Sequence, residues 1–427
     1  MGLGLLGRGV GDARFLAEQG AEVVVTDLKT EDELKESVKE LKSFDNISFV
    51  LGGHRMEDFE KADMVIKGAG VPLFSPYIER ARLKGVPVRM SSALFAEMTP
   101  AKVVGVTGTK EKTTVSYLLH HILKKDGKKT FLGGNARLLS TLAHLPESTK
   151  DEIAVLELDS WQLQGFAEVE ISPPYSVFTN FTPDHMDYYK EDMDAYFKDK
   201  ASIFLNQKEG DVLVLGEQVQ KRFTNFCGGD IKSEVITPSV NDIPKKELLS
   251  IPGEHNRYNM SLAVSLAGKF GISPKRCFKL LSDFKAAPGR LEYKGSFEKR
   301  KFYNDNNATT PDATVAAIKA LKGRIILIAG GADKGLSFEE MKNEMKSRVH
   351  MSFVLPGSGT ERLLKNIDRL KIEEVPDIKK AVELAYKFSK EGDTILFSPG
   401  FASFSQFKNA YQREKVFLKE IKRRFGL

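Results

Sequence analysis

The hydrophobic positions in the middle of the chain fall into short, nearly continuous apolar runs, and each run is followed by small or polar residues. Runs of this length predict buried β-strands, and the amphipathic stretches between several of them predict helices. The predicted strands are AKVVGVTGT, KKTFLGGN, IAVLELDS, YSVFTNF and GDVLVLG. This alternation favours a mainly parallel sheet with its ligand site at the carboxyl ends of the strands.

The two flanking parts of the chain carry the same rhythm. The first part has strand patterns in AEVVVTD, ADMVIKGAG and VPVRMSS, and the last part has them in KFYNDNNA, RIILIAGG, HMSFVLPGSG and DTILFSPG. We therefore predict an α/β protein of three consecutive α/β domains, over residues 1–98, 99–286 and 287–427. The first and third domains are expected to be Rossmann-like, and the central one to be a P-loop-type ATPase domain. Residues 217–250 are too irregular for an assignment.

Composition and charge narrow the class of protein. The 64 lysines and arginines exceed the 58 aspartates and glutamates by only six charges, which form no single run, so no nucleic-acid partner is expected. Cys227 and Cys277 form neither a metal-binding nor a disulfide pattern. The sequence has no apolar run of about 18 residues and no signal-peptide pattern at its start. We therefore expect a cytoplasmic protein that does not insert into membranes.

The sequence GVTGTKEKTT places a glycine–threonine turn between a predicted strand and a predicted helix. A lysine that opens such a helix, here Lys112, can reach the β- and γ-phosphates of a nucleotide, and the hydroxyl of Thr113 can bind Mg²⁺. Glu111 stands where such loops normally have glycine, so we expect a strained backbone and a carboxylate close to the phosphates. The candidate loop residues are Gly108, Thr109, Lys112, Thr113 and Thr114.

Three further side chains are candidates for binding cations. Glu157 lies inside the apolar strand VLELDS, where a carboxylate is costly unless a cation such as Mg²⁺ is near; the alternative is an edge strand with Glu157 facing solvent. His185 lies among carboxylates after another strand, in TNFTPDHMDYY. Lys200 shares an apolar helix face with Tyr196 and Ile203, and a buried neutral lysine can add CO₂ to form a carbamate, an oxygen ligand for a metal. The alternative is a lysine that extends to water.

The beginning of the chain has the pattern G-x-G-x-x-G at Gly2, Gly4 and Gly7, followed by a helix pattern and a strand that ends at Asp27. This pattern is typical of dinucleotide binding, with the acid at a ribose hydroxyl. A nicotinamide dehydrogenase is one interpretation. The glycine pattern alone also serves other nucleotides, and the strand that should precede it is absent from the sequence.

Together these motifs resemble the Mur ligase family over essentially the whole chain. The motifs that carry the resemblance are GVTGT-x-x-KTT, LELDSWQL, TNFTPDHMDYY, YFKDK, GEHNRYN, PGRLE and SPGFASFSQFKNAYQR. The last of them is similar to the branch of the family that adds D-glutamate. The resemblance implies a UDP-sugar-binding domain, a central ATP-binding domain and an amino-acid-binding C-terminal domain, in that order.

The resemblance also implies a reaction of peptidoglycan precursor synthesis. ATP would phosphorylate the alanine carboxylate of UDP-N-acetylmuramoyl-L-alanine, and the amine of D-glutamate would displace phosphate from the acyl phosphate, leaving ADP. The implied cofactors are ATP and Mg²⁺ at two sites, and a monomer is expected. A sister ligase that adds another amino acid is the nearest alternative.

The resemblance assigns a role to each candidate residue. The catalytic and metal set would be Lys112, Thr113, Glu157, His185 and carbamylated Lys200. ATP would also contact Asn256, Asn259, Arg290 and Asp305. The muramoyl-alanine end of the substrate would meet Asn135, Ser160 and Gln162. The uridine end would meet Gly4, Leu5, Leu6, Asp27 and Gly70. D-Glutamate would be held by Thr309, Lys334 and Ser403.

The chain departs from the family pattern at a few positions, and the phosphate loop is the most serious. The positions are Lys110 and Glu111 in place of asparagine and glycine, Asp159 in place of serine, Asn307 in place of lysine, and Ala410 in place of an aromatic residue. One like charge at about 5 Å and an effective dielectric constant of about 20 costs about 3 kcal/mol, or roughly a hundredfold in ATP affinity. A homologue with impaired ATP turnover, acting as a binding or regulatory protein, is therefore a second hypothesis.

Overall fold

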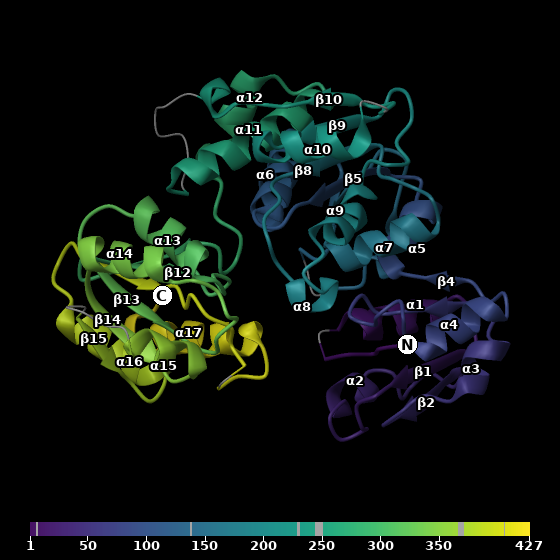
Figure 1. The fold of residues 1–427 in the computed structure, drawn as a ribbon, viewed down its shortest axis with the longest axis horizontal. Coiled ribbons are helices and arrows are strands. Elements are labelled where there is room, and N and C mark those ends of the chain that lie inside the picture. The colour runs from purple at the N-terminus through teal and green to yellow at the C-terminus, as the bar shows by residue number, and fades with distance from the viewer. Residues whose placement is uncertain (6, 137–138, 229–230, 244–250, 366–370, 405) are drawn as a thin grey trace. The chain divides into compact units, whose positions relative to one another are not determined.

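The computed structural model describes the whole chain except residues 6, 137–138, 229–230, 244–250, 366–370 and 405. The chain divides into two compact units. The first comprises Met1–Ile243 and Asn259–Leu280, and the second comprises Pro244–Tyr258 and Leu281–Leu427. Figure 1 labels the helices and strands of both units.

The first unit begins with two pairs of parallel strands, β1 (Val23–Asp27) with β2 (Ile47–Leu51) and β3 (Val65–Ile66) with β4 (Val88–Arg89). The start of the chain lies between the pairs. The Gly2 amide donates to the Thr26 carbonyl at 2.8 Å, and the Met1 amino group donates to the Ile66 carbonyl at 2.9 Å. The helices of this region are α1 (Arg8–Glu18), α2 (Lys35–Lys39), α3 (Met56–Lys61), α4 (Pro76–Leu83) and α5 (Ser91–Met98).

The first unit also contains a sheet of six parallel strands in the order β10-β9-β8-β5-β7-β6. This confirms the parallel sheet that the sequence predicts. Because β7 lies between β5 and β6, the alternative that placed Glu157 on a solvent-facing edge strand is wrong. The strands are β5 (Lys102–Thr107), β6 (Thr130–Gly134), β7 (Ile153–Glu157), β8 (Tyr175–Phe178), β9 (Val212–Leu215) and β10 (Glu234–Ile236).

Successive strand residues point to opposite faces of a sheet, and the strands β5 and β7 are buried along nearly their whole length. Both faces of the sheet are therefore apolar and are covered by helices. Val103 and Leu156 pack in one hydrophobic cluster with Phe166 of α7 and Phe197 of α9. Helix α6 packs on β5, β6 and β7 with its buried leucines. The helices are α6 (Lys112–Lys125), α7 (Ser160–Glu168), α8 (Met186–Tyr189), α9 (Met193–Ala201), α10 (Gln220–Cys227), α11 (Glu254–Gly268) and α12 (Pro274–Leu280), with short 3₁₀ turns at Leu142–Glu147, Glu217–Val219, Val240–Asp242 and Leu281–Asp283. Residues 254–258 of α11 and the last of these turns belong to the second unit.

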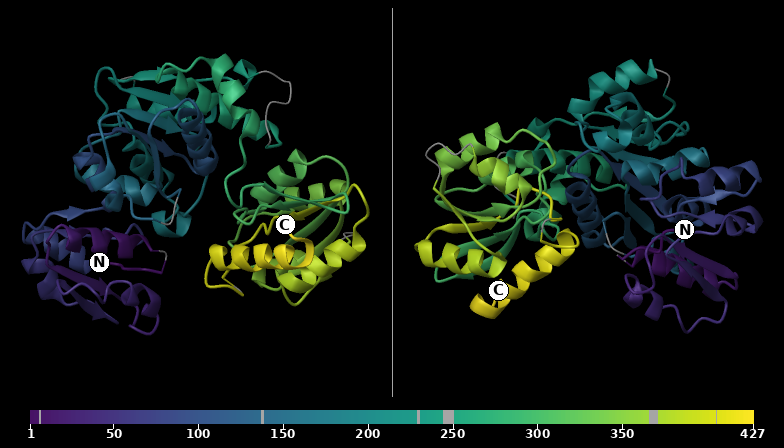
Figure 2. Two further views of the ribbon diagram at one scale, coloured as in Figure 1. Left: turned by 180° about the vertical axis from the view of Figure 1, so that it is seen from behind. Right: turned by 60° about the horizontal axis from the view of Figure 1, so that its bottom comes forward.

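The second unit is a six-stranded sheet in the order β11-β12-β16-β13-β14-β15, in which only the β11–β12 pair is antiparallel. Ile325 and Leu327 of β13 pack with α13 and α14, whereas the alternating Ile326 and Ile328 pack with α16 and α17. Figure 2 shows α17 in yellow beside α16. The strands are β11 (Glu292–Phe297), β12 (Arg300–Asn304), β13 (Ile325–Gly330), β14 (Val349–Leu355), β15 (Ile372–Glu374) and β16 (Thr394–Phe397). The helices are α13 (Pro311–Ala320), α14 (Glu339–Arg348), α15 (Ser358–Leu364), α16 (Ile378–Phe388) and α17 (Ala410–Phe425).

The α/β architecture follows the predicted order of elements, with four strands that the sequence pattern did not reveal: β2, β10, β11 and β15. The irregular segment after residue 217 contains α10 and the short edge strand β10. Over the described parts of the chain, no helix combines the length and the apolar character needed to cross a membrane.

Candidate functional site

The predicted phosphate loop connects β5 to α6, and the segment that follows β8 fixes its shape. Gly108 has φ 145°, and a Cβ at this position would lie 1.9 Å from Oγ1 of Thr179, so only glycine fits. The Thr109 amide donates to the carbonyl of Asn180 at 2.9 Å, and the Lys110 amide donates to its Oδ1 at 2.8 Å. Thr179 Oγ1 in turn donates to the Lys110 carbonyl at 2.7 Å. The loop is therefore preorganised by the end of a neighbouring strand.

Sequence reasoning gave no role to Thr179 or Thr182, which both hold this loop. Thr109 Oγ1 donates to the Thr182 carbonyl and accepts from the Thr182 amide, at 3.0 Å in each case. A signal for them is present in the sequence, because TNFTP lies at the end of the predicted strand YSVFTNF. The carboxyl ends of neighbouring parallel strands meet at one edge of a sheet, so residues in that position belong beside the loop.

Two lysine amines converge on one carbonyl oxygen of the loop, that of Gly108. Nζ of Lys112 lies 3.0 Å from this oxygen and 2.9 Å from the Thr109 carbonyl, and Nζ of Lys200 lies 2.8 Å from the Gly108 oxygen. Lys200 is only 1% exposed, so the alternative of a lysine that extends to water is wrong. Burial, and then the positive charge of Lys112, hold the pKa of Lys200 well below its ordinary value. Lys200 is therefore a candidate for a neutral, nucleophilic amine.

Glu157 is a buried carboxylate beside the loop strand. It is 3% exposed at the end of β7, and the β-sheet register pairs it with Val106 of β5. Its Oε2 atom has no hydrogen-bond partner among the residues that the structure describes. An unpaired buried carboxylate is costly, and a bound cation removes that cost. Glu157 thus fits the role of a Mg²⁺ ligand.

His185 and Lys200 both contact the ring of Tyr196. The His185 ring lies 6.4 Å from the Tyr196 ring and 4.5 Å from the Trp161 ring, measured between centroids. Nζ of Lys200 lies 4.8 Å from the Tyr196 centroid. Within the described ranges, no three His, Cys, Asp or Glu side chains gather as a metal site. A cation here would therefore also need ligands of other kinds, such as a hydroxyl, a carbamate or phosphate oxygens.

Glu111 has the strained backbone that its sequence position predicts. Its φ is 69° and its ψ is −4°, which is the left-handed conformation that favours glycine. Its Oε2 accepts a hydrogen bond of 2.6 Å from Nδ2 of Asn259, a predicted ATP-binding residue that is 1% exposed. Asn256, one helical turn earlier on α11, donates from Nδ2 to the Pro252 carbonyl at 2.6 Å. The carboxylate is therefore tied to a side chain that was expected to bind nucleotide.

The residues predicted for uridine surround the glycine turn before α1. Asp27 is 7% exposed, and its carboxylate accepts hydrogen bonds of 2.9 Å from the amides of Gly4 and Lys29. Gly4 has φ 67°, and Leu5 is 47% exposed. Leu6 lies outside the described residues, and Gly70 is exposed on the turn after β3. Asp27 therefore stabilises the glycine turn through these hydrogen bonds. Its contact with a ribose hydroxyl stays a prediction.

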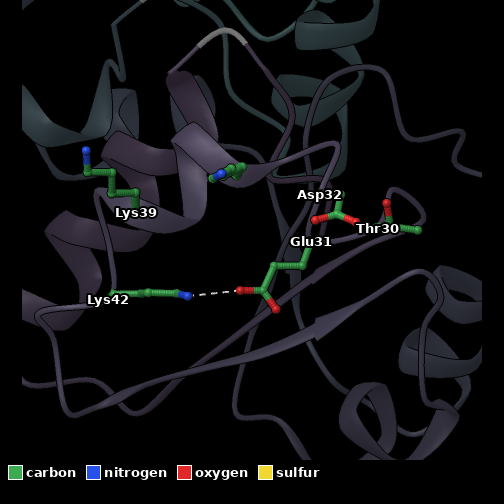
Figure 3. A pocket seen from close by; sticks show the side chains of 6 residues that line it. Thr30, Glu31, Asp32, Lys39 and Lys42 are labelled. Atoms are coloured by element: carbon green, nitrogen blue, oxygen red, sulfur yellow. Dashed lines mark hydrogen bonds and ion pairs between the residues drawn. The ribbon is translucent and has the colours of Figure 1, made fainter.

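A cavity of about 460 Å³ follows β1 in the same region (Figure 3). None of the residues predicted for uridine lines it. Lys42 donates to Glu31 at 3.0 Å across it, as the dashed line shows. The lining carries three lysines against two acids, so its charge gives little preference for an anion. The lining residues are Thr30, Glu31, Asp32, Lys35, Lys39 and Lys42.

The residues predicted for the muramoyl-alanine end follow the neighbouring strands β6 and β7. The Asn135 amide donates to the Glu157 carbonyl at 2.7 Å. Ser160 begins α7, whose N-terminus is capped by Asp159 through a hydrogen bond of 2.8 Å from the Gln162 amide. The Gln162 side chain donates from Nε2 to Ser92 Oγ at 3.0 Å. These residues thus follow the carboxyl ends of β6 and β7, the strand that ends at Glu157.

In the second unit, the residues predicted for D-glutamate come from loops after three neighbouring strands, β12, β13 and β16. Nζ of Lys334 donates to Oγ1 of Thr309 at 3.3 Å. Ala332 and Ala402 exchange backbone hydrogen bonds of 2.9 and 3.0 Å, which join the loop of Lys334 to the loop of the buried Ser403. The second unit therefore brings these three loops together.

Three residues predicted for ATP lie in the second unit: Asn256, whose contact is given above, Asp305 and Arg290. The carboxylate of Asp305 accepts from the Leu291 amide at 2.9 Å and from Ser398 Oγ at 2.7 Å. Nη1 of Arg290 lies 3.4 Å from the Asn307 carbonyl. Asp305 thus holds the start of β11, and its contact with ATP stays a prediction, as does that of Arg290.

Three stretches of the chain match domains of one family. Residues 1–90 match the Mur ligase MurD-like N-terminal domain, residues 106–242 match the Mur ligase middle domain, and residues 289–401 match the Mur ligase glutamate ligase domain. The fold is similar to that of UDP-N-acetylmuramate–alanine ligase MurC from Thermotoga maritima. The TM-score is 0.61 at 19% identity, over 99% of this chain and 98% of that chain.

Relatives similar to nearly the whole chain are named as UDP-N-acetylmuramoylalanine–D-glutamate ligases. The one from Roseiflexus sp. (strain RS-1) is 34% identical, over 98% of this chain and 96% of the relative. The one from Borreliella burgdorferi (strain ATCC 35210) is 35% identical, over 97% of this chain and 94% of the relative. By domain content and by identity over almost its full length, this chain belongs to the Mur ligase family.

Proposed function

We propose that this chain is an ADP-forming ligase that joins D-glutamate to UDP-N-acetylmuramoyl-L-alanine with conversion of ATP to ADP. The relatives that carry this activity in their names align along nearly all of the chain, and two of them are 34% and 35% identical. The observation that carries the proposal is structural. A buried carboxylate oxygen of Glu157 without a partner among the described residues lies beside a glycine loop on which two lysines converge. This is an arrangement for an anion together with a cation.

Lys112 would bind the β- and γ-phosphates of ATP. Its amine donates hydrogen bonds to the carbonyls of Gly108 and Thr109. With ATP bound, it would donate to charged phosphate oxygens in place of these neutral acceptors. Thr113 and Glu157 would hold one Mg²⁺. His185 and a carbamylated Lys200 would hold a second. When bound, Mg²⁺ neutralises phosphate charge, which favours phosphoryl transfer to the alanine carboxylate.

The burial of Lys200 favours its carbamylation. The neutral amine forms a C–N bond with CO₂ and releases one proton. The uncharged amine thereby becomes a carbamate anion, whose oxygens can bind Mg²⁺. The pKa of Lys200 lies well below its ordinary value, because the amine is buried and Lys112 is close. Carbon-13 NMR of the protein in labelled bicarbonate should show a carbamate signal, and the Lys200→Ala variant should lack it. The same spectrum in both proteins would exclude the carbamate.

The second unit would bind the amino acid. Lys334 and Thr309, 3.3 Å apart, would meet one carboxylate of D-glutamate, and Ser403 would complete the site. The amine of D-glutamate would attack the acyl phosphate, and the adduct would expel phosphate. Asn307 and Ala410 differ from the family pattern here, so a sister ligase that adds another amino acid is the alternative for this half of the reaction.

Phosphate release from MgATP tests the proposal directly. The protein is incubated with UDP-N-acetylmuramoyl-L-alanine, with D-glutamate present or absent. We expect release that depends on both substrates. Release with a different amino acid would identify a sister ligase. Binding of the sugar-nucleotide without any release would support a binding or regulatory protein, a function for which the Glu111–Asn259 contact is the specific observation.

The remaining parts of the proposal concern where and how the chain acts. Its substrates are cytoplasmic nucleotides, so we assign it to the cytoplasm. We also expect it to act as a monomer, which sedimentation equilibrium at assay concentration would check. The earlier dehydrogenase interpretation rested on the glycine turn and Asp27 alone. Membership of the Mur ligase family accounts for that turn as part of a UDP-sugar-binding domain.

A further inference from the structure

One side chain at the glycine turn has no role in the scheme above, and it is Arg8, the first residue of α1. Its Nη2 donates to Oδ1 of Asn135 at 2.8 Å and reaches the Asn135 carbonyl at 3.4 Å. Both residues are half-buried. One turn further along α1, Asp12 accepts a hydrogen bond of 2.5 Å from Ser140 Oγ. Helix α1 is therefore joined to the segment after β6 by hydrogen bonds at two places.

The Arg8 contact determines which way the Asn135 amide points. A guanidinium has only donors, whereas an asparagine amide has an oxygen that accepts and a nitrogen that donates. The oxygen must therefore face Arg8, and the NH₂ group is turned away from it. The backbone of Asn135 is fixed as well, because its amide donates to the Glu157 carbonyl at 2.7 Å. Because both its backbone amide and its side-chain oxygen are hydrogen-bonded, Asn135 loses little conformational freedom when a ligand binds.

Nδ2 of Asn135 makes no hydrogen bond with any residue in the described part of the chain, although its Oδ1 is engaged. The group thus offers two N–H donors and no acceptor. The alanine carboxylate of the sugar-nucleotide, or an amide or ether oxygen of its muramoyl group, is the matching acceptor. We propose that Arg8 is a positioning residue that fixes Asn135 as a hydrogen-bond donor to an acceptor oxygen of the muramoyl-alanine substrate.

This inference rests on the proposed function, and it adds a residue from the glycine turn to the recognition of the far end of the substrate. Without Arg8, the amide is free to rotate by 180° and to offer either group. The expected consequence is weaker binding of the sugar-nucleotide and unchanged binding of ATP. A charge-assisted hydrogen bond of this kind corresponds to roughly a tenfold change in affinity.

Binding is followed through the fluorescence of Trp161, the single tryptophan of the chain, which lies between Ser160 and Gln162. UDP-N-acetylmuramoyl-L-alanine is titrated into the wild-type protein and into Arg8→Met. We expect the variant to bind about tenfold more weakly, and KM for the sugar-nucleotide to rise by the same factor while KM for ATP and kcat change less than about twofold. Arg14→Ala is the matched control, because Arg14 is on the same helix but pairs with Glu40 at 3.1 Å on the surface.

Two further variants separate orientation from a general structural effect. Asn135→Asp can still pair with Arg8, but it offers no donor to the substrate. We expect it to lose as much affinity as Asn135→Ala, and Arg8→Met should cause no further loss in the Asn135→Ala background. If Asn135→Asp binds as well as the wild type, Asn135 does not act as a donor and the inference is wrong.

The outcomes also separate this inference from the proposed function. Wild-type binding and phosphate release with an unchanged affinity in Arg8→Met would overturn the inference and leave the ligase proposal intact. Absence of sugar-nucleotide binding by the wild-type protein would overturn both. If Arg8→Met does not fold, the Asn135→Asp result decides alone, since that change leaves the Arg8 pairing in place.

Discussion

Replacement of Glu111 by glycine is the sharpest test of the altered phosphate loop. Glu111 combines two unfavourable features, a left-handed backbone with φ 69° and a carboxylate beside a site for anions. Its carboxylate also engages Asn259 at 2.6 Å, so nucleotide must displace this contact before Asn259 can bind it. Glycine removes all three obstacles at once. We therefore expect Glu111→Gly to bind ATP more tightly.

The magnitude can be estimated from these contributions. Like-charge repulsion at about 5 Å and an effective dielectric constant of about 20 is about 3 kcal/mol. The N-terminus of α6 already stabilises a carboxylate by about 0.3–1 kcal/mol, which lowers that figure. We expect a gain of about ten- to a hundredfold in ATP affinity. Stability should change little, since relief of about 1–2 kcal/mol of backbone strain is offset by loss of a charged hydrogen bond of about 1.5–3 kcal/mol.

Calorimetric titration with MgATP and MgADP measures the effect, and Glu111→Gln is the matched control. Glutamine keeps the strained backbone and an oxygen for Asn259 but removes the charge. If repulsion dominates, Glu111→Gln recovers most of the gain. If release of Asn259 dominates, only Glu111→Gly does. Unchanged affinity in both variants would refute the reasoning and mean that the loop already accommodates the carboxylate.

Three other substitutions test the remaining site and one buried charge. Lys112→Ala should abolish phosphate release but leave sugar-nucleotide binding intact in the Trp161 titration. Lys200→Ala should lose activity and regain part of it with short carboxylic acids, which can replace a carbamate; full activity without them would contradict the carbamate. Lys67 is 2% exposed and donates to the Val71 carbonyl at 2.9 Å, and burial lowers its pKa from 10.5 to about 8. Since the folded protein binds this proton less tightly than the unfolded chain, stability should rise with pH between about 8 and 10.5. Lys67→Met should remove that rise and add up to about 3 kcal/mol at pH 7, less about 1 kcal/mol for the lost hydrogen bond, as measured by urea unfolding.

The sequence predicted the parts of the site that depend on local patterns. The loop between β5 and α6, the burial of Glu157 and the apolar face of Lys200 follow from strand and helix periodicity, which is a local property. The strain at Glu111 followed from its place before the helix. The convergence of Lys112 and Lys200 on one carbonyl could not be predicted, because it depends on how α9 packs against the sheet.

The elements that were missed have weak local signals. β15 has three residues at the edge of its sheet, and β11 pairs with β12 across a register shift near Gly295. Both are partly exposed, so neither shows the continuous apolar run that marks a buried strand. The partner of the Glu111 carboxylate was also unpredictable, since Asn259 lies 148 residues further along the chain. Long-range pairing of polar side chains leaves no periodic signal in a sequence.

The charges around Gly108 explain how a carboxylate in the loop can be compatible with nucleotide binding. Lys110 and Lys112 supply two positive charges, Glu111 cancels one of them, and the lowered pKa of Lys200 favours its neutral form, so the group keeps about one net positive charge. Carbamylation of Lys200 would cancel that charge as well. A loop with so little positive charge cannot hold a nucleotide triphosphate alone and depends on the charge of the metal. ATP affinity should therefore fall more steeply on removal of Mg²⁺ in the wild-type protein than in Glu111→Gly, and an equal Mg²⁺ dependence in the two proteins would show that Glu111 does not contribute to the field at the phosphates.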